Sequence, residues 1–150
     1  MTHDPAIFGY LGRALSFELS AVQQYLSMAR LLDLRGMPQA GDKFRHEAQE
    51  EMQHAERIIG RMLALGVAPN ASRLRPVRLD GSLPELIQHA TDLETIIIEF
   101  YAQAVRHCSG TQDHENRIFF DALLREEQQH ASGINSWWQE ILNDQSARLD

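Results

Sequence analysis

Six side chains in this 150-residue sequence have the residue types and the spacing of metal ligands. They are four glutamates and two histidines that interrupt apolar helical stripes near their middle: Glu18, Glu51, His54, Glu94, Glu127 and His130. Each histidine follows a glutamate by three positions, which places both side chains on one helical face within reach of one cation. Mixed carboxylate and imidazole ligands suit Fe²⁺ or Mn²⁺ better than a zinc site built from cysteine and histidine.

The same pattern occurs twice along the chain. The segment Glu50–Ala55 returns as Glu126–Ala131, an offset of 76 residues (126 − 50 = 76). Other pairs with this offset are Glu18 and Glu94, Tyr25 and Tyr101, and Ile58 and Ile134. One Glu-x-x-His motif is a weak indication of a metal site, but two copies with matching glutamates are a strong one. Two equivalent helical hairpins pack around a pseudo-twofold axis, where we expect a paired site.

Carboxylates on the core side of a helical bundle need compensating charge, because an isolated buried carboxylate costs several kcal/mol. Four glutamates carry four negative charges, which two divalent cations balance. One glutamate from each of two helices, with Glu-x-x-His from each of the other two, is the arrangement of di-iron and di-manganese carboxylate proteins. The expected assignment is Glu18 and His54 on the first metal, Glu94 and His130 on the second, and Glu51 and Glu127 bridging both. The alternative for the six residues is a set of structural hydrogen bonds without metal.

Three nearby residues are candidates for the surroundings of this centre. Glu50 and Glu126 are expected to accept hydrogen bonds from the two histidines, and Tyr25 is expected to donate one to a ligand carboxylate. The alternatives are solvated helix acids for the two glutamates and an ordinary core tyrosine for Tyr25.

Four long helical patterns position these ligands. The expected helices cover residues 5–34, 39–65, 82–108 and 111–143. Asp4 and Pro5 form a good helix start, and Ser82 with Glu85 has the spacing of a capping box. The first two helices and the last two are joined by short connections, so each pair forms an antiparallel hairpin, whereas residues 66–81 are long enough to cross the whole bundle. The fold class is therefore all-α, a four-helix bundle with the ferritin-like crossover.

Composition limits the remaining possibilities. The length favours a single domain over residues 1–150. The net charge of −7 argues against a nucleic-acid partner, which needs a basic surface. No apolar run is long enough to span a membrane, and the first residues lack the pattern of a signal peptide. Cys108 is the only cysteine, so no intrachain disulfide forms, which fits a cytoplasmic location.

From Leu11 to about Leu142 the sequence resembles the bacterioferritins. The residues that carry the resemblance are Glu18, Tyr25, Glu51-Met52-x-His54-Ala55, Glu94 and Glu127-x-x-His130. The resemblance implies an iron-storage subunit whose ferroxidase centre has this ligand set. It also implies a homo-oligomer, with a dimer as the building block of a hollow shell, and a small ferredoxin as electron donor for iron release.

The resemblance further implies a haem b between two subunits, with Met52 of each subunit as an axial ligand. Met52 is about 100° around the helix from Glu51, so it points away from the metal axis towards a neighbouring subunit. The alternative is an ordinary interface methionine. The resemblance also suggests that His46 and Glu50 form an iron site on the inner surface of the shell, although the family more often has Asp at the second position. Glu47 lies one turn from Glu51, where it can pass incoming iron.

One departure from the family concerns the C-terminus. Typical members have a short fifth helix, but the residues after Ile141 are few and polar, so we expect that helix to be absent or vestigial. A smaller shell or a simple dimer is then an alternative to the usual 24 subunits.

The leading functional hypothesis is a ferroxidase that oxidises Fe²⁺ at a di-iron centre with O₂ or H₂O₂ and stores the product. One alternative is a stand-alone di-iron peroxidase or oxygenase similar to rubrerythrin. The other is a helical assembly protein that binds haem or metal without catalysis.

Overall fold

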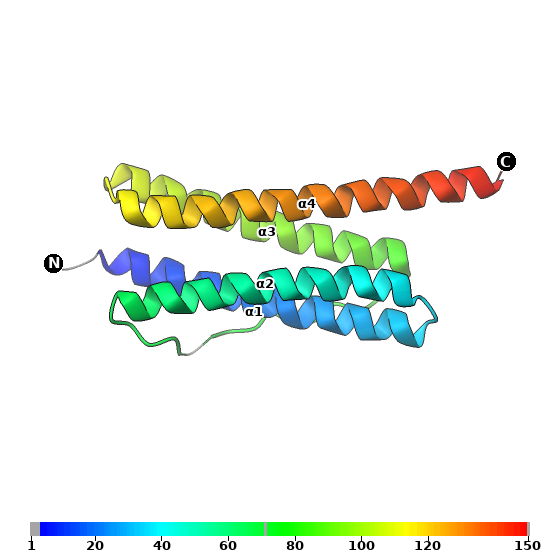
Figure 1. Cartoon of the computed structure of the whole chain (residues 1–150), viewed down its shortest axis with the longest axis horizontal. Coiled ribbons are helices and arrows are strands. Elements are labelled where there is room, and N and C mark those ends of the chain that lie inside the picture. Colours follow the sequence, from blue (N-terminus) through cyan, green and yellow to red (C-terminus); the bar gives the residue numbers. More distant parts are fainter. Residues whose placement is uncertain (1–3, 71, 150) are drawn as a thin grey trace.

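The structure is a computed structural model that describes residues 4–70 and 72–149, with side chains described up to residue 144. Four helices make up the fold: α1 (Pro5–Leu34), α2 (Pro38–Ala64), α3 (Leu83–Gly110) and α4 (His114–Leu149) (Figure 1). The all-α fold class and the four expected helices are confirmed, and no strand occurs in the described part of the chain.

The starts and ends of the helices follow from local sequence. Asp4 Oδ1 accepts a hydrogen bond from the backbone N–H of Ala6 at 3.0 Å, and Pro5 occupies the first helical position. The expected capping box between Ser82 and Glu85 is present at the start of α3. Gly36 and Gly66, at φ +78° and +82°, take the left-handed conformation just after α1 and α2, where glycine is least strained.

The expected bounds of α4 were wrong at both ends. Gln112 has φ +59° and turns the chain, so α4 begins only at His114, after Asp113 has accepted a hydrogen bond from the backbone N–H of Asn116 at 3.2 Å. At its other end the helix continues beyond the expected residue 143 to Leu149, because residues 134–150 contain neither glycine nor proline. Within residues 72–149, no further helix follows α4.

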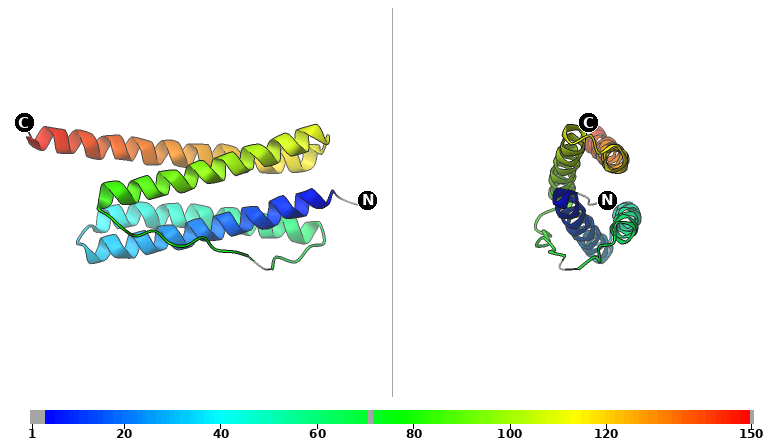
Figure 2. Two further views of the ribbon diagram at one scale, coloured as in Figure 1. Left: turned by 180° about the vertical axis from the view of Figure 1, so that it is seen from behind. Right: turned by 90° about the vertical axis from the view of Figure 1, so that its left-hand side faces the viewer.

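The helices form two antiparallel hairpins, α1 with α2 and α3 with α4, and α1 lies beside α3 (Figure 2). The chain between α2 and α3 travels the length of the bundle along α1, as expected for the crossover connection (Figures 1 and 2).

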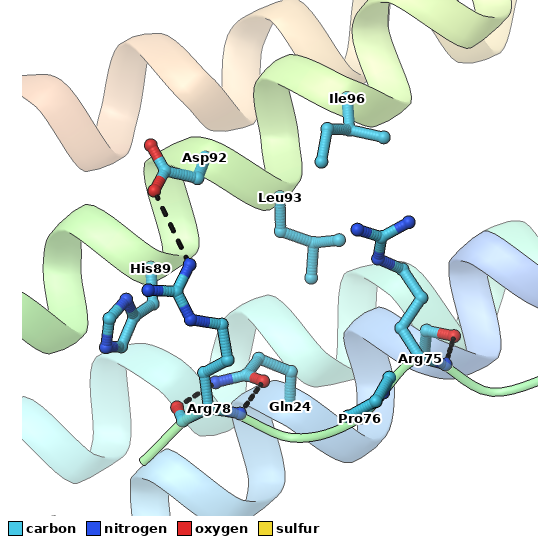
Figure 3. A pocket seen from close by; sticks show the side chains of 9 residues that line it. Gln24, Arg75, Pro76, Arg78, His89, Asp92, Leu93 and Ile96 are labelled. Carbon is cyan, nitrogen blue, oxygen red and sulfur yellow. Dashed lines mark hydrogen bonds and ion pairs between the residues drawn. The ribbon is translucent and has the colours of Figure 1, made fainter. Parts of the chain in front are cut away.

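Three polar side chains on one face of α1 hold this crossover. Ser16 Oγ accepts from the backbone N–H of Arg73 at 3.0 Å, and Ser20 Oγ accepts from that of Arg75 at 2.9 Å. Gln24 binds one residue twice: its Oε1 accepts from the N–H of Arg78 at 2.9 Å, and its Nε2 donates to the carbonyl of Arg78 at 2.7 Å (Figure 3). Serine and glutamine at positions i, i+4 and i+8 thus serve as side-chain partners for an extended backbone that has no strand to pair with.

The core follows the apolar stripes of the four helices. The largest fully buried side chains include Tyr25, Tyr101, Phe44, Phe120 and Ile58. Phe44 stacks on Tyr25 with ring centroids 5.9 Å apart, and its edge meets Trp137 at 5.4 Å.

None of the helices in the described residues is long and apolar enough to cross a membrane.

Candidate metal centre

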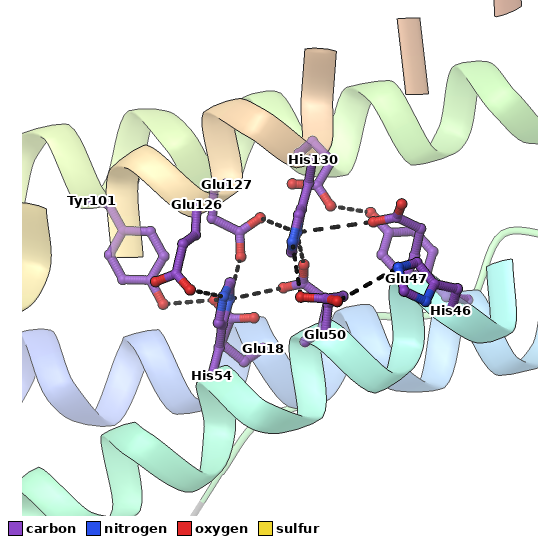
Figure 4. A network of polar contacts seen from close by, with 12 residues as sticks. Glu18, His46, Glu47, Glu50, His54, Tyr101, Glu126, Glu127 and His130 are labelled. Atoms are coloured by element: carbon purple, nitrogen blue, oxygen red, sulfur yellow. Dashed lines mark hydrogen bonds and ion pairs between the residues drawn. The ribbon is translucent and has the colours of Figure 1, made fainter. Parts of the chain in front are cut away.

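The six side chains singled out by the sequence meet at the middle of the bundle. Figure 4 labels Glu18, His54, Glu127 and His130 among them, with their polar ends pointing toward one another. Glu18 comes from α1, Glu51 and His54 from α2, Glu94 from α3, and Glu127 and His130 from α4. The four glutamates are fully buried. Each helix delivers its ligands from inside an apolar stripe, so the packing of the stripes brings the acids together.

Two overlapping groups can each hold a cation. In the first group, ligand atoms of Glu18, Glu51, His54 and Glu127 all lie within 4.8 Å of one another; the second consists of Glu51, Glu94, Glu127 and His130. Glu51 and Glu127 belong to both groups, the positions expected of bridging ligands. The geometry thus matches the expected assignment, while metal binding itself stays a prediction.

The two histidines contact the glutamates through equivalent atoms. His54 Nδ1 lies 2.8 Å from Glu127 Oε1, and His130 Nδ1 lies 2.7 Å from Glu51 Oε1. The two rings are stacked, with centroids 5.3 Å apart and planes 5° from parallel. Each hairpin therefore provides the histidine that contacts the shared glutamate of the other hairpin, as a pseudo-twofold axis requires.

Two tyrosines orient the other two glutamates. Tyr25 donates to Glu94 Oε1 at 2.5 Å, which confirms the hydrogen bond expected of Tyr25. Tyr101 donates to Glu18 Oε1 at 2.6 Å. The second bond was missed from sequence, although the offset of 76 residues between the two tyrosines already pointed to it.

Each glutamate has one oxygen that lacks a hydrogen-bond partner in the described residues. These buried atoms are Glu18 Oε2, Glu51 Oε2, Glu94 Oε2 and Glu127 Oε2. A buried acceptor without a partner costs about 1–3 kcal/mol, and more when it is charged. Four such oxygens around two imidazoles form a donor set that fits a pair of hard divalent cations.

The electrostatics of the cluster point the same way. Burial raises the pKa of Glu18 and of Glu51, and raises that of Glu94 well above its usual value. Burial lowers the pKa of His54, but hydrogen bonds with surrounding glutamates outweigh that effect and raise it to about 12. The same balance raises the pKa of His130 to about 10. The cluster therefore holds protons tightly unless another positive charge replaces them.

The outer glutamates do not make the hydrogen bonds expected of them. Glu126 Oε1 lies 3.8 Å from His54 Nε2, and Glu50 Oε2 lies 3.6 Å from His130 Nε2. Both distances are too long for a hydrogen bond, although an ion pair or a bridging water remains compatible with them. The longer separation follows from other partners, because Glu126 is held by Arg57 at 2.6 Å.

Comparison with known proteins identifies the family. A Ferritin family model, described as a ferritin-like domain, matches residues 9–143. A bacterioferritin of Rhodobacter capsulatus is 32% identical over 136 residues, which cover 91% of this chain and 84% of that protein. This chain belongs to the bacterioferritins. A bacterial ferritin of Synechocystis sp. is also similar, at 31% identity over 87% of this chain and 85% of that protein.

A solved bacterioferritin agrees with this membership. The Rhodobacter capsulatus structure, which has a metal-free dinuclear site and haem iron in a crystallographic special position, aligns with a TM-score of 0.89 and 29% identity. The alignment covers 95% of this chain and 89% of that one. The bundle that carries the six side chains is thus a bacterioferritin bundle over nearly its whole length.

Met52 lies apart from the metal cluster in this bacterioferritin chain. It follows the buried Glu51 on α2 and is 48% exposed. A long apolar side chain so exposed fits the expected position at a subunit interface, and its role as a haem ligand stays a prediction.

Proposed function

We propose that this bacterioferritin chain is an iron-storage subunit that oxidises Fe²⁺ to Fe³⁺ at the six-residue cluster. The observation that carries the proposal is the pair of overlapping four-residue groups, whose glutamates each retain a buried oxygen without a hydrogen-bond partner. Membership in the ferritin family supports storage of iron and assembly from several copies of the chain.

The substrate ions supply the electrons. Two Fe²⁺ ions lose one electron each, and the electrons with two protons reduce one O₂ to H₂O₂, or one H₂O₂ to two H₂O. The four carboxylates neutralise four positive charges on binding, and their fixed negative charge favours the additional charge of Fe³⁺.

The chain's own residues determine where the ions sit. Glu51 and Glu127, each common to both ligand groups, fix the separation of the two positions. Tyr25 and Tyr101 hold Glu94 and Glu18 through one oxygen and leave the other free. Since burial keeps the pKa of both phenols well above the usual value, they remain hydrogen-bond donors throughout.

Glu47 is the candidate for passing iron to the cluster. Its Oε2 is buried, has no hydrogen-bond partner and lies 3.9 Å from His130 Nδ1. His46, whose side chain is 68% exposed, lies 3.5 Å from Glu50, which in turn lies 3.6 Å from His130. Carboxylates and an imidazole thus lead from solvent to the second metal position.

The haem proposal is separate. Met52, together with Met52 of a second copy, would hold a haem b, which would supply electron transfer from a small ferredoxin for iron release. Haem reconstitution of the purified protein should give a Soret band that Met52→Leu removes. A colourless protein after haem addition would contradict this part alone.

Iron oxidation is tested by replacing a ligand. Glu18→Ala should slow oxidation of Fe²⁺ by more than about a hundredfold, since loss of even the outer partners of metal ligands costs 10- to 100-fold. The matched control is Glu99→Ala on α3, a 68% exposed side chain 3.9 Å from Arg106. An oxidation rate in Glu18→Ala equal to that of the control would refute the assignment.

A further inference from the structure

The two metal positions have equivalent ligands but different surroundings. At the first position, Arg57 on α2 reaches across to α4, where its Nη1 lies 2.6 Å from Glu126 Oε2. Glu126 also lies 3.8 Å from His54 Nε2, so the pair closes over the outer side of His54. The 76-residue offset places Gly133 at the position on α4 that corresponds to Arg57 (133 − 57 = 76). Glycine has no side chain to close the second position in the same way.

An opening lies where the second arginine is missing. Gly133 lines a cavity of about 140 Å³ together with Glu47, Phe44 and Trp137. A methyl group added to Gly133 would have no atom within 4 Å. Glu47 brings a buried oxygen from this cavity to within 3.9 Å of His130, whereas the residue related to Glu47 by the offset is Leu123, an apolar core residue.

Exposure of the histidines reflects this difference. The side chain of His54 is 2% exposed and that of His130 is 13% exposed. Glu50, the counterpart of Glu126, has exposed His46 at 3.5 Å in place of a bridging arginine. Solvent therefore reaches the metal position at His130 more easily than the metal position at His54.

We propose that the position formed by Glu94 and His130 exchanges divalent metal with the surroundings through the cavity beside Gly133. The Arg57–Glu126 pair retains the metal at the position formed by Glu18 and His54. Arg57 is a positioning residue in this scheme, because it acts on the first metal through Glu126 and His54. The inference rests on the proposed dinuclear centre.

The test follows release of Co²⁺ from the full chain after a chelator is added without oxygen. Wild-type protein should release two Co²⁺ per chain in a fast and a slow phase of equal size. Arg57→Ala should speed the slow phase by about threefold, a change that corresponds to about 0.7 kcal/mol and lies within the range of partly exposed ion pairs. Arg57→Lys should retain the slow phase, and Arg106→Ala, which disrupts an exposed pair on α3, should change neither phase.

A variant designed to close the opening at Gly133 tests the proposal independently. Gly133→Arg puts an arginine opposite Glu50 and should slow the fast phase, while the matched control Gly133→Ala should keep it. Misfolding cannot mimic this result, because a damaged bundle loses metal faster rather than more slowly.

The outcomes separate the two proposals. A chain that binds no Co²⁺ would refute the proposed dinuclear centre. Two Co²⁺ leaving in a single phase, or a slow phase unchanged in Arg57→Ala, would overturn the exchange scheme while the centre itself stands. A fast phase unchanged in Gly133→Arg would also overturn it.

Discussion

The metal cluster and the crossover both place polar groups against helices of the bundle, but they satisfy those groups in opposite ways. Along the crossover, Ser16, Ser20 and Gln24 find backbone partners within the chain. In the cluster, each glutamate keeps one buried oxygen without a hydrogen-bond partner among the described residues. Buried polar groups are normally hydrogen-bonded, so this difference between the two regions supports the proposal that the cluster binds an external ligand.

The largest expected effect comes from a change that removes charge but keeps shape. Glu51→Gln should reduce Fe²⁺ oxidation by more than about a hundredfold, because it weakens both metal positions together. The metal-free variant should unfold at the same temperature as wild type or higher, since a buried carboxylate is replaced by a neutral amide. Oxidation assays and thermal unfolding of one preparation measure both, and a lower unfolding temperature would mean that Glu51 has a structural task.

Metal should stabilise the cluster increasingly as the pH rises. The folded-state pKa values of His54 and His130, about 12 and about 10, exceed the unfolded value of 6.5. Their contribution to metal-free stability is therefore complete below pH 6.5 and is lost as the pH rises towards these folded values. Cations bound at the proposed centre would replace these protons, so their affinity should increase with pH.

Thermal unfolding with and without Co²⁺ measures this difference. At pH 8, a Co²⁺ concentration of about 100 times the dissociation constant should raise the unfolding temperature by roughly 5–10 °C. The same Co²⁺ concentration should raise it by less at pH 6, where the affinity is lower. A metal effect that shrinks between pH 6 and pH 8 would contradict the explanation.

The crossover offers the complementary change. Gln24→Ala removes both hydrogen bonds to Arg78 and should cost about 1–2 kcal/mol of unfolding free energy. Metal stoichiometry should stay unchanged, because Gln24 belongs to neither ligand group. Urea unfolding and Co²⁺ titration measure the two effects, and a loss of bound metal would show that the regions are coupled.

The smallest effect is expected at the orienting tyrosines. Tyr101→Phe removes only the hydrogen bond to Glu18 Oε1 and should slow oxidation by about tenfold. Tyr25→Phe should act similarly through Glu94, since the two bonds are related by the 76-residue offset. If the two variants slow oxidation by different factors, the two tyrosines do not contribute equally, and the difference between the two metal positions includes them.

Much of this molecule could be predicted from sequence, because its signals are local or repeated. The helix bounds were predicted to within a few residues from the helical period, from Pro5 and from the Ser82–Glu85 capping box. The exception is the end of α4, which continues through a polar segment that has no helix-breaking residue. The six cluster residues stood out because acids and histidines at core positions are costly, and the offset doubled that signal.

The surroundings of the cluster could not be predicted in the same way. Whether Glu126 contacts His54 or Arg57 more closely depends on side-chain distances between α2 and α4. The helical periodicity of the sequence carries no information about these distances. The cavity beside Gly133 is present because glycine has no side chain to fill it. Its importance became apparent only from the comparison with Arg57, the residue at the equivalent position of α2.

Anomalous diffraction from crystals of the full chain loaded with Co²⁺ tests the central claim most directly. The expected result is two cobalt peaks per chain, both adjacent to Glu51 and Glu127, with His54 on one and His130 on the other. Cobalt found only elsewhere on the surface, with the six side chains still bonded to one another, would contradict the assignment of this cluster as the metal centre.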